Sequence, residues 1–304
     1  MARAGSVGTL HWINSPFYSN NANFIFQCGD KILEKYLWHY LNMVKDRLIK
    51  MSAKSTIQSL RNDELSNLLL YVPPIFVQRQ IIDIIEPIEK LRETLISSVN
   101  KNLQLCKKLL KLIIINKSFT TMRNLKDVDF IKSGINDFVN NKEYIDTSCI
   151  DGVQQVKEGI NITLLDRPSR ANMQPIVNSV WLAKLSNSPK FILVKDYSKD
   201  ILSKQIFSTG FIGLTSTNQY LINYLYILVQ TKDFQSNKDL NSSGTTMIGI
   251  NNNSFLSIQI PNLSIDEINE YGKKIDTILM NNYVMSKNIE YLNEIHSKLI
   301  NLLI

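Results

Sequence analysis

Histidines and cysteines are the side chains in this sequence with the widest catalytic and metal-binding range, and the chain has three of each. The cysteines lack the CxxC spacing of zinc sites and redox pairs, so no metal centre and no disulfide framework are predicted. His39 falls in a segment expected to be helical and His296 on an apolar helix face, so both are interpreted as structural. His11 has no second type of ligand close by. We therefore assign no metal ligand.

Catalytic motifs are also missing from the sequence. The segment Val72-Pro73-Pro74-Ile75 lacks the Asn or Asp and the aromatic residue of the motif that methylates adenine. No GxxxxGK[ST] phosphate loop, GxSxG elbow or HExxH helix is present. The sequence therefore predicts a protein that is not an enzyme and has no cofactor of its own.

The composition sets loose limits on function. The formal net charge is +7 and the isoelectric point is about 9.1, which suits nucleic-acid binding but also many proteins that bind none. The longest mostly apolar run, Leu68 to Val77, contains two prolines and falls short of the ~20 residues of a membrane span. The first residues have no apolar core of a signal peptide. We expect a cytoplasmic protein without membrane contact.

Two stretches have the apolar spacing of long helices. The seam predicted for the first contains Ile81, Ile84, Ile88, Leu91 and Leu95 and continues to Ile113. The seam predicted for the second contains Ile268, Ile275, Ile278, Met285, Ile289, Leu292 and Leu299, with the polar residues Asn282 and His296 among them. One such helix alone would fit an ordinary bundle. Two helices of ~60 Å bury their stripes most simply against each other, as an antiparallel coiled coil.

Both long helices have local signals along them. Pro87 lies off the first seam and predicts a kink or a new helix start, because proline lacks the amide donor of a helix interior. Ser264 and Glu267 have the spacing of a capping box at the start of the second helix.

The chain also repeats itself. The pattern YLxxYL occurs at 36–41 and again at 220–225, Ser55-Thr56-Ile57 matches Thr245-Thr246-Met247, and Ala2-Arg3 matches Ala183-Lys184. The order of the matches is kept, so a duplicated architecture is predicted. The predicted parts are the end of a globular domain at 1–75, a long helix at 76–119, a complete globular domain at 120–262 and a long helix at 263–304. The fold class expected is α+β, with mixed α/β domains joined by two long helices.

These parts and several motifs resemble the specificity (S) subunit of type I restriction–modification systems. The motifs that carry the resemblance are Ser52 to Ile57, Val72-Pro73-Pro74, Gln78 to Ile82, Tyr144-Ile145-Asp146, Ile150-Asp151-Gly152 and Arg167-Pro168-Ser169-Arg170-Ala171. The segment Met1 to Gly8 is similar to one that lies in the middle of a recognition domain of this family. The resemblance thus implies a first target-recognition domain truncated at its N-terminus and a complete second one.

The resemblance implies that each domain reads half of a split DNA target and that the coiled coil sets the spacer between the halves. The expected DNA contacts are Arg167, Ser169, Arg170, Asn172 and Lys184, with Arg3 as the counterpart of Lys184. Arginine can bond guanine and asparagine adenine, while serine and lysine can hold phosphate.

The partners implied are methyltransferase (M) and restriction/translocase (R) subunits. S-adenosylmethionine, ATP and magnesium would bind to those subunits. Arg79, Lys90 and Arg92, which lie off the seam, are candidates for methyltransferase docking.

Two other interpretations stay open at this stage. The chain could be a degenerate, non-functional fragment of the same family, as the missing N-terminal strands suggest. It could also be a coiled-coil scaffold that binds no DNA. The absence of catalytic motifs from the sequence disfavours an enzyme of unknown class.

Overall fold

The computed structural model describes residues 1–52, 59–244 and 248–304, and the chain forms two compact units. Unit 1 consists of Met1–Ile96 and Lys287–Ile304, and unit 2 of Ser97–Ser286. Each long helix contributes its two ends to different units. The repeated segments Ser55-Thr56-Ile57 and Thr245-Thr246-Met247 lie outside the described residues.

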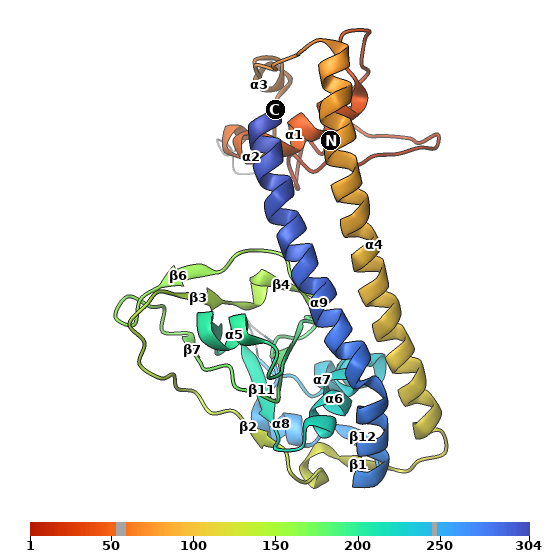
Figure 1. Ribbon diagram of the computed structural model, residues 1–304, viewed down its shortest axis with the longest axis vertical. Helices are drawn as coiled ribbons and strands as arrows, with labels where there is room; N and C mark the ends of the chain where they lie inside the picture. The colour runs from red at the N-terminus through yellow and green to blue at the C-terminus, as the bar shows by residue number, and fades with distance from the viewer. Residues whose placement is uncertain (53–58, 245–247) are drawn as a thin grey trace. The chain divides into compact units, whose positions relative to one another are not determined.

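Unit 1 is built from short helices around a small apolar core (Figure 1). The helices are α1 (Glu34–Met43), α2 (Lys45–Ser52), α3 (Asn62–Ser66), the first part of α4 (Ile75–Ile114) and the last part of α9 (Ile265–Leu303). Tyr36 and Tyr40, from the first YLxxYL pattern, donate hydrogen bonds to the backbone oxygens of Tyr71 and Leu69, at 3.0 and 2.6 Å. The pattern is therefore an amphipathic helix whose tyrosines fasten the chain that leads into α4.

A buried glutamine fixes the start of α4. Gln78 accepts a hydrogen bond from the amide of Leu33 at 2.8 Å and donates to the oxygens of Lys31 and Pro73, at 2.9 and 2.7 Å. One side chain thus satisfies three backbone groups, because a primary amide can both accept and donate hydrogen bonds.

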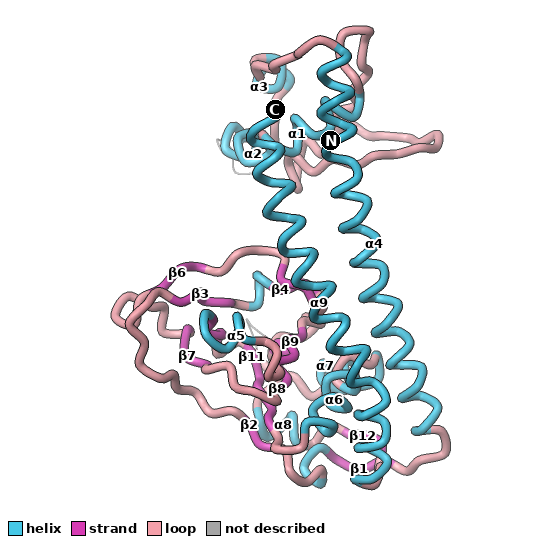
Figure 2. The backbone as a smooth tube through the Cα atoms, in the orientation of Figure 1, coloured by secondary structure: helices cyan, strands magenta, loops and turns pink. Residues whose placement is uncertain are grey.

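Unit 2 contains the β-sheets of the described residues (Figure 2). One four-stranded sheet has the order β6-β3-β10-β7 and another the order β2-β11-β8-β9. The strand bounds are β2 (Asp129–Phe130), β3 (Lys142–Ile145), β6 (Ile160–Ile162), β7 (Ala171–Met173), β8 (Ser179–Ala183), β9 (Phe191–Val194), β10 (Gln205–Ser208) and β11 (Phe211–Thr215). The two-stranded sheets pair β1 (Phe119–Thr121) with β12 (Gln259–Pro261), and β4 (Ile150–Asp151) with β5 (Gln154–Gln155).

The helices of unit 2 complete its larger core. They are α5 (Lys199–Lys204), α6 (Gln219–Leu228), α7 (Lys232–Leu240), α8 (Asn252–Leu256), the last part of α4 and the first part of α9 (Ile265–Leu303), with 3-10 turns η1 (Met122–Asn124) and η2 (Thr147–Cys149). The predicted capping box of the last helix is confirmed: the Ser264 amide donates to Glu267 at 2.9 Å, and the Glu267 amide donates to Ser264 Oγ at 3.3 Å. The expected α+β class with two long helices packed together is confirmed.

Each unit has an internal backbone contact at a position related by the repeat. In unit 1 the amide of Leu60 donates to the oxygen of Arg3 at 2.9 Å, and in unit 2 the amide of Ile250 donates to the oxygen of Lys184 at 2.9 Å. α6 carries the second YLxxYL pattern, as α1 carries the first. The sequence repeat is therefore also a structural repeat.

Within each unit, α4 lies against α9. In unit 1, Ile81 and Ile85 of α4 share a cluster with Ile300 of α9, and in unit 2 Tyr271 of α9 donates a hydrogen bond to the Cys106 oxygen of α4 at 2.8 Å. Every predicted seam residue of α9 is buried or half-buried.

The buried face of α4 differs from the predicted seam in unit 1. Ile84 and Leu91 are 45% and 50% exposed, whereas Ile85 is fully buried. The reason is that α1 also packs on α4, with Tyr36 in the same cluster as Ile81 and Ile85. The two predicted positions, Ile84 and Leu91, therefore belong to the solvent face, and the buried stripe lies one residue further along the helix. No helix among the described residues is long and apolar enough to cross a bilayer.

Candidate nucleic-acid interface

The loop before β7 contains most of the residues expected to contact DNA. Ser169 and Arg170 are exposed, whereas Arg167 and Asn172 are half-buried. Arg167 Nη1 donates to the Ala171 oxygen at 2.7 Å and lies 3.4 Å from Asn172 Oδ1. Arg167 therefore uses part of its guanidinium to hold the loop in shape, and its remaining N–H groups are available to a ligand.

Arg170 lies against the turn between β10 and β11. The Arg170 oxygen accepts a hydrogen bond from the amide of Thr209 at 2.9 Å. A Cβ atom at Gly210 would lie 3.0 Å from Arg170 Nη2 and 3.3 Å from Ser208 Oγ. The absence of a side chain at Gly210 is thus what lets the guanidinium lie along this turn.

Lys184 approaches the same turn from the end of β8. Its amide donates to the Gly210 oxygen at 2.9 Å, and its side chain is half-buried. Burial, and then the positive charge of Arg170, hold the pKa of Lys184 below its ordinary value. No acidic side chain among the described residues forms an ion pair with Arg170 or Lys184. The fold therefore concentrates positive charge here without neutralising it, as suits an anionic ligand.

Lys190 adds a cation near this turn that the sequence did not single out. Its ammonium donates to the Thr147 oxygen at 2.5 Å, and Thr147 Cγ2 lies 3.4 Å from the Cβ position of Gly210. No local motif marks Lys190, because only the pairing of distant strands brings it to the turn.

The expected counterpart in unit 1, Arg3, has a different environment. Its Nε donates to the Leu60 oxygen at 3.1 Å, and its guanidinium carbon lies 5.6 Å from the ring centroid of Phe24. Arg3 thus matches Lys184 in its backbone contact but is held by its own unit.

Unit 1 also has an apolar hollow of about 370 Å³ between the loop 10–28 and α1. The rings of Trp12 and Trp38 meet edge to face with centroids 5.8 Å apart, and Tyr18 is fully exposed.

Polar contacts interrupt both parts of the α4–α9 pairing. Asn102 Nδ2 donates to Asn282 Oδ1 at 2.8 Å in unit 2, while His296 Nε2 lies 3.0 Å from Glu89 Oε1 in unit 1.

The three residues of α4 that the sequence suggests for partner docking differ in their exposure. Arg79 and Lys90 are exposed, whereas Arg92 is half-buried and bonds Asn293 at 3.3 Å.

Comparison with known proteins adds independent information. A family model described as the type I restriction modification DNA specificity domain matches residues 1–105. No curated protein sequence matches the chain. The solved S subunit of a type I restriction–modification system from M. genitalium matches with 16% identity and a TM-score of 0.50, over 99% of this chain and 81% of that chain.

Two further solved structures match with lower scores. One is a structure of the type I R-M system described for its assembly and conformational transition, with 11% identity, a TM-score of 0.38, and coverage of 88% of this chain and 70% of that chain. The other is the HsdS subunit from Thermoanaerobacter tengcongensis, with 10% identity, a TM-score of 0.37, and coverage of 88% and 69%.

Residues 1–105 thus resemble this specificity domain, and the whole chain has a fold similar to that of the solved S subunit.

Proposed function

We propose that this chain selects the DNA target of a type I restriction–modification complex and brings it to methyltransferase and restriction subunits. In this proposal the domain at 120–262 reads one half of a split target, and the long helices set the spacer to the other half. The observation that supports it best is the unneutralised pair Arg170 and Lys184 at the β10–β11 turn.

The division of labour at this turn follows from side-chain geometry. Arg170 and Ser169 are exposed, so they are assigned to the DNA, with arginine able to bond guanine bidentately. Lys184 is half-buried and is assigned to a phosphate, which a point charge holds without sequence preference. Arg167 and Asn172 support the loop and contribute their outward groups.

The test is co-expression of the chain with its cognate methyltransferase, followed by mapping of methylated adenines. Arg170→Ala should relax or change bases in one half of the target only, because loss of a bidentate contact costs ~1–3 kcal/mol of discrimination. Lys184→Ala should weaken binding to all sequences alike and reduce its salt dependence. Arg123→Ala, an exposed arginine on η1, removes the same charge elsewhere in unit 2 and serves as the control.

A domain exchange tests the larger proposal. Replacing 120–262 with the domain of another family member should change one half of the target and leave the other half and the spacer as they were. Changes in both halves would contradict the division into two reading domains. The absence of both a methyltransferase complex and split-site methylation would favour the degenerate fragment or the scaffold.

A further inference from the structure

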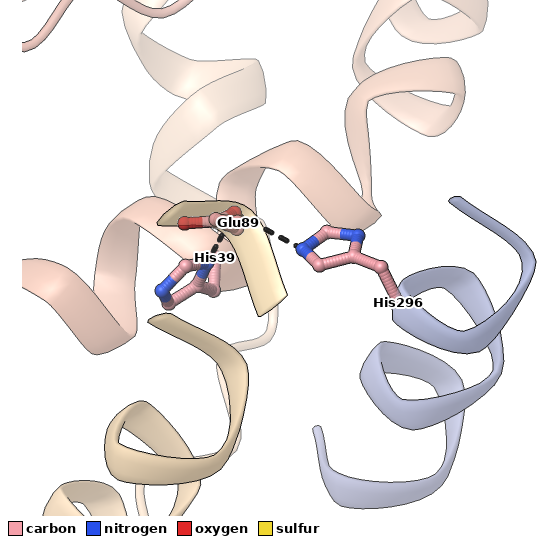
Figure 3. A group of neighbouring side chains, drawn as sticks. All are labelled: His39, Glu89 and His296. Atoms are coloured by element: carbon pink, nitrogen blue, oxygen red, sulfur yellow. Dashed lines mark hydrogen bonds and ion pairs between the residues drawn. The ribbon is translucent and has the colours of Figure 1, made fainter. Parts of the chain in front are cut away.

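Three side chains from distant parts of the sequence meet inside unit 1 (Figure 3). His39 comes from α1, Glu89 from α4 and His296 from α9. Glu89 Oε1 lies 3.0 Å from His296 Nε2 and 3.6 Å from His39 Nδ1, and all three ligand atoms lie within 4.8 Å of one another. Two imidazoles and one carboxylate are a donor set that zinc uses, with a water molecule in the fourth position.

The three side chains of the cluster differ in their exposure to solvent. The side chain of His39 is 2% exposed, whereas those of Glu89 and His296 are 25% and 23% exposed. An ion and its water could therefore enter from the His296 side.

The repeat-related position in unit 2 already holds a cation. When the two YLxxYL patterns are aligned, His39 of α1 matches Asn223 of α6. When the two long helices are aligned by their apolar seams, Glu89 of α4 matches Asp276 of α9. There the ammonium of Lys195, whose side chain is 2% exposed, lies 3.1 Å from Asn223 Oδ1 and 3.9 Å from Asp276 Oδ1. In unit 1 the residue that matches Lys195 is the exposed Asn14, so the cluster has no lysine at the corresponding position.

From these contacts we propose that His39, Glu89 and His296 bind a divalent transition-metal ion, with Zn²⁺ as the ion of choice, and so fasten α1 to both long helices. Imidazole and carboxylate ligands suit Zn²⁺, while Mg²⁺ prefers a shell of oxygens. Lys35, paired with Glu86 at 2.8 Å, and Arg92 bring positive charge to the edge of the cluster, so the affinity should be lower than that of a four-ligand structural zinc site. The site is independent of the proposed DNA contacts in unit 2.

The experiment uses the full chain, freed of metal with a chelator, in a Cys28→Ser background that removes the half-buried thiol. Binding is measured by titration with Co²⁺, whose visible absorption reports tetrahedral coordination, and by the rise in Tm with Zn²⁺. The test variant is His296→Gln, because His296 is partly exposed and the protein should fold without it. His11→Gln is the matched control, since His11 is exposed and lies outside the cluster.

The parent chain and His11→Gln should bind Co²⁺ and gain Tm with Zn²⁺ but not with Mg²⁺. His296→Gln should weaken binding by more than about tenfold, since losing a ligand costs at least as much as losing its hydrogen-bonded support. Glu89→Gln should act in the same direction. Equal responses of the parent and His296→Gln, or no Co²⁺ binding by the parent, would overturn the proposal.

Discussion

Gly272 is a point of close approach between α9 and α6 in unit 2. A Cβ atom at this position would lie 2.2 Å from the oxygen and 2.7 Å from the carbonyl carbon of Tyr220 in α6. Both are backbone atoms, so they cannot swing aside as the end of a side chain could. Asn223 Nδ2 also donates to the Gly272 oxygen at 3.0 Å, which ties the same two helices together.

The substitution Gly272→Ala sets two effects against each other. Alanine is favoured over glycine in a helix interior by ~1 kcal/mol. To accept the methyl group, however, the helices must part by about 1 Å, which is the difference between 2.2 Å and ordinary contact at 3.4 Å. Overpacking costs ~1–3 kcal/mol or more, and a weakened hydrogen bond adds ~1 kcal/mol. We expect a net loss of about 1–3 kcal/mol in the stability of unit 2.

The measurement must report on unit 2 alone, because a chain of two units need not unfold in one step. Trp181 is fully buried in unit 2, whereas Trp12 and Trp38 belong to unit 1. In a Trp12→Phe, Trp38→Phe background, the fluorescence of Trp181 therefore follows unit 2 during denaturation. Asn281→Ala, exposed on the same helix, is the control and should be neutral or slightly stabilising. If Gly272→Ala is as stable as the parent or more so, the close approach of α6 and α9 is refuted.

Three further predictions concern unit 2. Gly213→Ala should destabilise it by ~1–3 kcal/mol, because a Cβ atom would lie 2.6 Å from the buried Trp181 ring; an unchanged denaturation midpoint would contradict this. Asn102→Leu should lower the free energy of unfolding by ~1–3 kcal/mol, because it leaves Asn282 without its partner. In a double-mutant cycle, the double variant with Asn282→Leu should recover most of this loss, and additive losses would argue against the contact. Burial raises the pKa of Tyr271 far above its ordinary value. The unfolded chain therefore releases the Tyr271 proton at a lower pH than the folded chain, and stability should fall as the pH rises above ~10. Tyr271→Phe should make this fall of stability with pH less steep by up to ~1.4 kcal/mol per pH unit. An unchanged pH dependence would exclude Tyr271 as its source.

The long helices could be predicted because their periodicity is local. The 3,4 spacing from Ile268 to Leu303 follows buried and half-buried positions of α9, although α9 also packs on α6 at Gly272. The same spacing misplaced Ile84 and Leu91, because α1 also packs on that part of α4. A pattern along one helix carries no information about a second neighbour.

The candidate sites depend on contacts across the chain and were harder to predict. The residue types of 167–172 indicate a DNA contact, but only the β10–β11 turn brings Arg170 and Lys184 together. The sequence alone presents His39 and His296 as separate structural residues, since nothing in it reports that α1 and α9 meet at Glu89. The repeat offers one signal that could have found this site: it aligns Glu89 with Asp276 and His39 with Asn223.

The repeat also determines what a domain exchange must preserve. An exchange of 120–262 would carry α6 with Tyr220 and Asn223 but leave Gly272 and Asp276 behind on α9. The backbone of the imported helix would then have to contact Gly272 as the backbone of Tyr220 does. The imported helix would also need a polar side chain to replace Asn223, which donates to Asp276 Oδ1 at 2.7 Å. In unit 1 the residue that matches Gly272 is the fully buried Ile85, so α1 and α4 pack through side chains instead. A domain taken from a unit of that kind should therefore leave a cavity over Gly272 and leave Asp276 without the contact that Asn223 makes, even if the loop that corresponds to 167–172 is intact.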